Sequence, residues 1–207
     1  MYQPAHFREE RLEVQHALIK AHPFGLLVSV GPDGPEANGV PFLLDIAAAP
    51  LGELKTHVAR ANNQWRNLDG QNVLAVFQGP QAYVSPSNYE TKRETGKVVP
   101  TWNYVMVQVR GIARVHEDAN WLKAQVASLT QTHEGGLAQP WQVSDAPSSY
   151  IESQLKGIVG IEIAIASIEG KWKVNQNRPE ADRRGVSEGL GNGEMADLVR
   201  QYGGLED

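Results

Sequence analysis

The sequence contains no cysteine, which excludes disulfide bonds, thiolate nucleophiles and cysteine-ligated zinc. It also has no run of roughly 20 apolar residues, the length that a membrane-spanning helix needs. The first ten residues, MYQPAHFREE, lack the apolar stretch of a signal peptide, so we expect a cytoplasmic protein without a membrane partner. The net charge of −5 disfavours a nucleic-acid-binding surface, because DNA affinity depends mainly on cationic contacts to phosphates.

Several catalytic and metal-binding patterns are missing as well. The six histidines show no H-E-x-x-H or comparable ligand spacing, so no metal site is predicted. The segment GLGNG (189–193) lacks the third glycine of a dinucleotide fingerprint. Ser153 and Lys156 form an S-x-x-K without its companion motifs. No acid, base or nucleophile in the sequence therefore demands an enzymatic function.

The residues that are present predict one domain over 1–207, because a chain of this length and 41% hydrophobic content can bury a sizeable core. Val105, Val107 and Val109 alternate with polar residues, as in a half-buried strand. The patterns predict helices at 8–21, 118–133, 148–156 and 194–202, and strands at 24–30, 36–45, 54–58, 73–77, 82–85, 104–115 and 159–165. Most strands follow one another directly, which favours an antiparallel β-barrel with helices packed outside.

Three polar, aromatic clusters stand next to predicted strands: HVARANNQW (57–65), GPQAYVSPSNY (79–89) and VPTWNY (99–104). None of them has the periodicity of a strand or a helix. A binding site for a flat, phosphorylated ligand needs both aromatic walls and short polar side chains. We therefore place the candidate ligand site in these clusters.

The first cluster contributes His57, Arg60 and Asn62, which fall where a strand ends. Arg60 offers a planar fork of donors that suits phosphate oxygens, and the other two could add neutral hydrogen bonds. The structural alternative is a surface arginine with an asparagine that caps a helix beginning near Asn63. Residue chemistry leaves both interpretations open.

The other clusters contribute Tyr83, Ser85, Thr101, Trp102 and Asn103, where Trp102 could stack on a flat ring or could plug a barrel end. The basic segment 171–184 allows two interpretations, a solvated surface stretch or a phosphate or DNA contact. Two of its members, Lys173 and Arg178, complete the set of candidate cofactor-binding residues.

Taken together, these segments resemble the PaiB-type family of FMN-binding negative transcriptional regulators. The match runs from MYQPAHF through the three clusters to KVNQNRP and covers most of residues 1–180. The sequence departs from the family pattern at three positions. Gly39 replaces a common His, Asn63 a usual Pro and Asn88 a usual Trp.

The resemblance implies a mainly β fold with flanking helices, an antiparallel split β-barrel of the FMN-binding type. It also implies a homodimer with flavin at the subunit interface, and DNA as a partner. The apolar strands at 104–115 and 159–165 independently favour a dimer, since an exposed apolar strand face is a liability. Two other functions stay open: an FMN-dependent oxidoreductase of the flavin-reductase or pyridoxamine-oxidase kind, and a split barrel that binds haem or another small molecule through His57 or His116.

Overall fold

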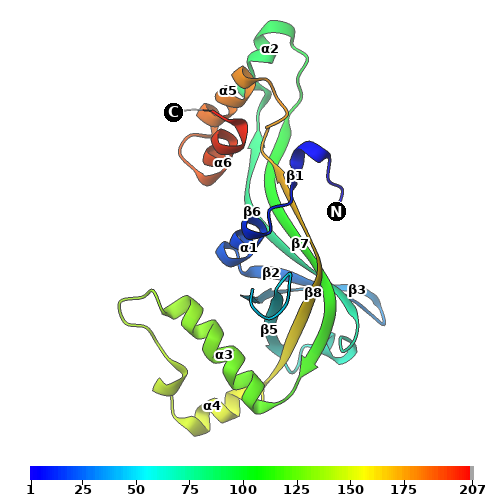
Figure 1. Ribbon diagram of the computed structural model, residues 1–207, viewed down its shortest axis with the longest axis vertical. Helices are drawn as coiled ribbons and strands as arrows, with labels where there is room; N and C mark the ends of the chain where they lie inside the picture. Colours follow the sequence, from blue (N-terminus) through cyan, green and yellow to red (C-terminus); the bar gives the residue numbers. More distant parts are fainter. Residues whose placement is uncertain (206–207) are drawn as a thin grey trace. The chain divides into compact units, whose positions relative to one another are not determined.

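The structure is a computed structural model that describes residues 1–205 (Figure 1). Its strands are β1 (Arg8–Glu9), β2 (Phe24–Gly31), β3 (Gly34–Pro41), β4 (Leu43–Asp45), β5 (Glu53–Ala59), β6 (Asn72–Val84), β7 (Thr101–His116) and β8 (Ile158–Lys173). The α-helices are α1 (Leu12–Ala21), α2 (Glu90–Thr95), α3 (Ala119–Glu134), α4 (Ser148–Leu155), α5 (Glu180–Leu190) and α6 (Glu194–Gly203). Short 3₁₀ helices are η1 (Ala5–Phe7), η2 (Asn63–Asn67), η3 (Pro86–Asn88) and η4 (Val143–Asp145).

All eight strands belong to one sheet, in the order β3-β2-β6-β7-β8-β5-β4, and β1 pairs with β8. The registered pairs are antiparallel: β2 with β3 and β6, β5 with β4 and β8, and β1 with β8. The β2–β3 pair is a hairpin closed by the glycines at 31 and 34. The predicted antiparallel sheet with flanking helices is thereby confirmed.

Backbone contacts divide the chain into two compact units, and the single domain over 1–207 stays a prediction. The first unit comprises residues 1–18, 78–107 and the described chain from Glu169 onward. The second comprises residues 19–77 and 108–168. Strands β6, β7 and β8 contribute residues to both units, so neither unit is a continuous stretch of sequence.

Strand alternation places the core as the sequence predicts. Val105, Val107 and Val109 are completely buried on one face of β7. On β8, Ile161 and Ile163 are buried in the same way. Alternate residues of a strand point to opposite faces, so these two strands present continuous apolar faces to the interior.

Two predicted strand limits are wrong. The sequence places a break between the strands at 73–77 and 82–85, but β6 continues through Gly79-Pro80; its registered pairing with β2 covers residues 74–76 and does not involve Pro80. A proline can stay in a strand where no neighbour needs its missing N–H. The strand predicted at 159–165 also continues further, to Lys173, and Gly170 in this extension pairs with Glu9 of β1.

Two helix predictions also need correction. The first helix begins at Leu12 rather than at Arg8, since residues 8 and 9 form β1 against β8. Its buried face contains Leu18 and Ile19 together with two polar residues, rather than the predicted stripe of Val14, Ala17, Leu18 and Ala21. Residues 180–190 form α5, a helix that the sequence analysis does not predict.

The glycines of α5 allow a close approach to η3 within the first unit. A Cβ added at Gly185 would lie 2.2 Å from the main-chain oxygen of Asn88. A Cβ at Gly189 would lie 2.5 Å from the side-chain amide of the same residue. Glycine spacing of i, i+4 puts both positions on one helix face, so their lack of side chains is what lets η3 pack there.

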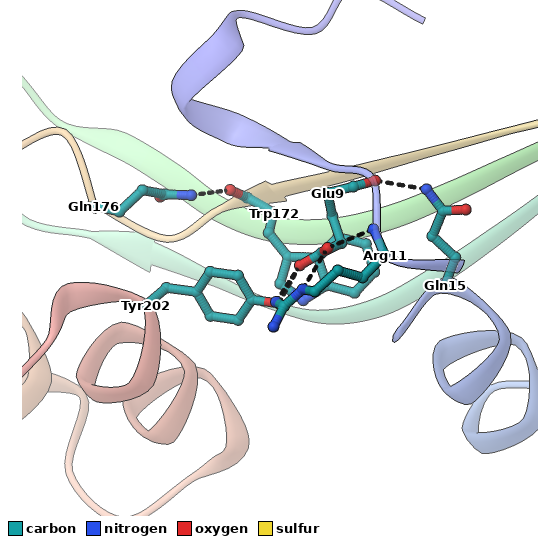
Figure 2. Close-up of polar contacts among 6 residues, drawn as sticks. All are labelled: Glu9, Arg11, Gln15, Trp172, Gln176 and Tyr202. Carbon is teal, nitrogen blue, oxygen red and sulfur yellow. Dashed lines mark hydrogen bonds and ion pairs between the residues drawn. The ribbon is translucent and has the colours of Figure 1, made fainter. Parts of the chain in front are cut away.

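A polar network joins β1 to α6 within the first unit (Figure 2). Arg11 donates to both carboxylate oxygens of Glu9, at 2.9 and 2.6 Å. The Tyr202 hydroxyl donates to Glu9 Oε2 at 2.6 Å, and Arg11 Nη2 lies 2.9 Å from the same hydroxyl. Glu9 is buried, so its charge depends on these two partners.

Candidate functional site

The ten candidate residues fall into two groups. His57, Arg60 and Asn62 belong to the second unit, at the end of β5 and just beyond it. The other seven belong to the first unit, at the ends of β6, β7 and β8 and shortly after them; they are Tyr83, Ser85, Thr101, Trp102, Asn103, Lys173 and Arg178.

His57 is held by α3. Its Nδ1 lies 2.9 Å from the Oε1 atom of Gln125, a buried residue of that helix. With the amide oxygen as acceptor, Nδ1 is the donor of this hydrogen bond. His57 is therefore fixed to α3 through Nδ1, and Nε2 is the nitrogen left for another contact.

Arg60 joins the end of β5 to the start of β8. Its guanidinium donates to the main-chain oxygens of Lys156 at 2.9 Å and Ile158 at 3.2 Å, and it pairs with the Glu117 carboxylate. Trp65 donates its indole N–H to the Arg60 carbonyl at 3.0 Å. These contacts give Arg60 a structural role, and a phosphate at this guanidinium would have to compete with Glu117.

Asn62 caps η2, as the structural alternative for this segment predicts. Its side chain accepts a hydrogen bond from the Gln64 N–H at 3.0 Å. Gln64, which the sequence does not single out, is buried and donates to the Leu27 carbonyl and the Ser29 hydroxyl. Its amide oxygen accepts from Asn38 at 2.8 Å, so this glutamine ties η2 to the β2–β3 hairpin.

In the first unit, Tyr83 and Trp102 form an aromatic pair. Their ring centroids lie 6.0 Å apart at 69°, an edge-to-face arrangement. Tyr83 is 52% exposed and Trp102 is 54% exposed. A side chain with more than half of its surface exposed does not fill the core, so the interpretation of Trp102 as a barrel plug is wrong.

Lys173 lies beside this pair, and the charges of Lys171 and Arg178 act on it. Lys173 Nζ donates to the Thr101 hydroxyl at 2.6 Å and to the main-chain oxygen of Trp102. Lys171 is buried, with its ammonium 5.3 Å from the ring centre of Tyr104. The Arg178 guanidinium lies 5.2 Å from the ring centre of Tyr89, and among residues 1–205 none of the three cations pairs with a carboxylate.

No carboxylate in the described chain neutralises Lys171, Lys173 or Arg178, so these positive charges act on one another. Burial lowers the pKa of Lys173, and the positive charges of Lys171 and Arg178 lower it further. Like charges held together without a counter-ion attract an anion. The segment 171–184 is thus not simply a solvated surface stretch, since Lys171 is buried and Lys173 is half-buried.

Ser85 and Asn103 differ in their hydrogen bonding. Ser85 caps η3 by accepting from the Ser87 N–H at 3.2 Å. Asn103 is completely buried, and both polar atoms of its amide lack a hydrogen-bond partner within the described chain. A buried amide without partners costs about 1–3 kcal/mol per group, so Asn103 has unused capacity to bind a polar group.

All three departures from the family pattern have a local explanation in the structure, Asn88 through its close packing against Gly185 and Gly189 of α5. At Gly39, an added Cβ would lie 2.8 Å from the Phe24 ring, which occupies the space a larger residue would take. At Asn63, the side-chain oxygen accepts from Arg66 Nε at 3.2 Å within η2. The described residues contain no cluster of metal-ligating side chains and no helix long and apolar enough to cross a bilayer.

Comparison with known proteins places this fold in a sequence family. The family described as "Putative FMN-binding domain" matches residues 1–167. An uncharacterised protein of Emericella nidulans is 34% identical over 249 residues, covering 100% of this chain and 99% of the relative. The protease synthase and sporulation protein PAI 2 of Bacillus subtilis is 31% identical over 208 residues, covering 100% and 97%.

A solved structure supports the same fold assignment. The FAD and haem binding protein of Mycobacterium smegmatis matches with a TM-score of 0.58 at 15% identity, covering 79% of this chain and 71% of that one. Similarity at this level of identity shows the fold alone, which is the predicted split β-barrel. The whole-length sequence relatives add the family: this chain belongs to the PaiB-type FMN-binding family.

Proposed function

We propose that this chain binds FMN through the first-unit group. The observation that carries the proposal is the trio Lys171, Lys173 and Arg178, cations without carboxylate partners in the described chain. Of these, Lys173 donates to the main chain of Trp102, which forms an exposed aromatic pair with Tyr83. Unpaired cations suit a phosphate and an aromatic wall suits a flat ring. Bound FMN would supply the redox chemistry, while the chain supplies binding and orientation.

The residues of this group divide into two roles. Trp102 and Tyr83 would contact the ring, because their exposed faces are available for stacking. Lys173 and Arg178 would hold the phosphate, with the Thr101 hydroxyl beside Lys173 as a neutral donor. Asn103 is completely buried and follows Trp102 on β7, so its side chain points to the opposite face of the strand and is not assigned to the ring.

The phosphate assignment differs from the sequence-based prediction, which places the phosphate at Arg60. Arg60 has carbonyl and carboxylate partners, whereas Lys173 bonds only to neutral oxygens and keeps its charge uncompensated. An anion gains most where no other anion is already bound. This difference in partners is the reason for preferring Lys173.

A visible spectrum and two matched variants test the proposal. The purified protein should show flavin absorption or acquire it on titration with FMN, and a haem band instead would overturn it. Lys173→Met should weaken FMN by about tenfold or more but riboflavin little, since only FMN carries the phosphate and a charge-assisted contact contributes about 1.5–3 kcal/mol. Arg60→Met should change both ligands equally, and selective loss of FMN in that variant would return the phosphate to Arg60.

We further propose that the protein is a homodimer. The predicted reason needs correction, because the apolar faces of β7 and β8 are already buried within the chain. Exposed apolar side chains lie instead on the second unit's sheet: Phe24, Leu26 and Val30 on β2 are 70%, 47% and 75% exposed, and Ile112 on β7 is 54% exposed. A second copy of this chain would cover such a surface.

Light scattering at micromolar concentration is expected to give the mass of two chains. The double variant Leu26→Glu/Val30→Glu should give one chain with unchanged secondary structure, because a carboxylate is costly in an apolar interface. The charge-matched pair Ala138→Glu/Gln139→Glu, at exposed positions between α3 and α4, adds the same two carboxylates and should remain dimeric. A monomeric parent protein would rule out the dimer.

The regulatory role that the resemblance implies is also a proposal. With a net charge of −5, any DNA contact would have to rely on local basic residues. Gel-shift measurements with the chain's own upstream DNA, with and without FMN at a fixed low salt, would test it. Binding that does not depend on FMN would argue against a flavin-controlled regulator.

A further inference from the structure

A cavity lies in the helical part of the second unit. It has a volume of about 570 Å³ and is lined by α3, α4 and the segment that connects them. Figure 1 shows these two helices with their long connection. The volume falls within the range of about 300–1,000 Å³ that is usual for small-molecule sites.

The walls of the cavity are faces of regular structure. Lys123 and Ala127 lie one turn apart on α3, and Ile151, Glu152 and Leu155 share one face of α4. Residues at i, i+3 and i+4 of a helix point to the same side. Ala127 is small, so the two helix faces that meet here leave a space instead of filling it.

The third wall is held in place by specific hydrogen bonds. The main-chain N–H of Trp141 donates to the Glu134 carboxylate at 2.9 Å. The next turn is closed by a capping box between Gln142 and Asp145. Trp141, which is 44% exposed, therefore presents its indole to the cavity from an ordered segment, a requirement for a preformed site.

The charges in the lining indicate the class of ligand. Lys123 and Glu152 both line the cavity, and neither forms an ion pair within the described part of the chain. The remaining wall is largely apolar, with Trp141, Ile151 and Leu155. A cation and an anion that face one apolar cavity without pairing with each other are complementary to a ligand with both charges and an apolar body.

We propose that this cavity binds a small zwitterion with apolar side groups, of amino-acid to dipeptide size. Lys123 contacts the carboxylate of the ligand and Glu152 contacts its ammonium group. Trp141, Ile151 and Leu155 contact the apolar side groups. This proposal does not depend on flavin binding, so it can be tested separately from the proposed cofactor.

Calorimetric titration with the dipeptide leucyl-phenylalanine tests the site. The parent protein should bind the dipeptide, and N-acetylation or C-amidation of the ligand should each weaken binding by about tenfold or more. Lys123→Met should remove the penalty for amidation only, and Glu152→Gln the penalty for acetylation only. Trp141→Ala should weaken all three ligands.

Control measurements show whether a change in affinity arises at the cavity or from a general change in stability or charge. Lys123 and Glu152 are exposed and lack ion-pair partners, so both variants should keep the parent melting temperature. Lys97→Met, at an exposed lysine outside the cavity, should leave every affinity unchanged. Absence of dipeptide binding at millimolar concentration, or charge variants that do not change the ranking of the three ligands, would overturn the proposal.

Discussion

Replacing Glu9 by Gln is expected to lower the free energy of unfolding by about 3 kcal/mol at pH 7. Burial by itself raises the pKa of Glu9, but hydrogen bonds from Arg11 and Tyr202 outweigh it and lower the pKa from 4.5 to about 2. The folded state therefore favours the ionised carboxylate. Glutamine keeps the shape of the side chain but not its charge, so it loses this stabilisation.

The pH dependence has a definite sign. Because the folded-state pKa is the lower one, the stabilisation is complete above about pH 4.5 and disappears as the pH falls towards 2. Urea unfolding at pH 7 should show the full difference between the parent and Glu9→Gln, and the two should converge at the acidic end. For a chain of this length the melting temperature should fall by about 6–12 °C at pH 7.

Glu10 is the matched control. It is the neighbouring carboxylate and pairs with Arg8, but its side chain is 75% exposed. Exposed ion pairs contribute about 0–1 kcal/mol, so Glu10→Gln should leave stability nearly unchanged. Equal losses for the two variants would show that general charge, rather than the contact of β1 with α6, accounts for the effect.

Replacing Trp102 by Ala should reduce FMN affinity by about tenfold or more while thermal stability changes little. The side chain is more than half exposed, so its removal leaves no cavity in the core. Its ring meets Tyr83, and its main chain is fixed by Lys173, which places it beside the proposed cationic group. Fluorescence quenching by FMN should also decrease in this variant.

Trp172 provides the opposite case in the same unit. It is only 4% exposed and stacks on Tyr202, with ring centroids 6.5 Å apart. Trp172→Ala should cost about 3–5 kcal/mol of stability, and the molecules that remain folded should bind FMN normally. If Trp102→Ala instead behaved like Trp172→Ala, the assignment of Trp102 to the flavin ring would fail.

Features set by local sequence were predictable. The alternation of Val105, Val107 and Val109 predicts their common burial, and Asp118 caps α3 as the acidic residues at its start indicate. The predictions failed where residues far apart in the sequence pair in the folded chain. Arg8 and Glu9 leave the predicted helix because β8 offers them a strand partner more than 160 positions away.

The candidate site likewise combines features that the local sequence predicts with contacts that only the fold creates. Aromatic and polar clusters could be recognised along the sequence, but not their partners. Lys173 meets Thr101 across 72 positions, and Arg60 meets the Ile158 carbonyl across 98. No periodicity signals that Gln64 is buried, because its hydrogen bonds to Leu27 and Ser29 depend on the folded hairpin. Side-chain type predicted what could bind, and only the fold showed which donors were already used.

The close packing of η3 against α5 implies that substitutions at positions 88 and 189 are coupled during evolution. The Asn88 amide fills the space that any side chain at 189 would enter, so a larger residue at either position requires α5 to shift. Relatives that keep Trp at position 88 should therefore dock their C-terminal helices differently. Restoring that Trp in this chain alone would be a harmful reversion, whatever its effect on the ligand.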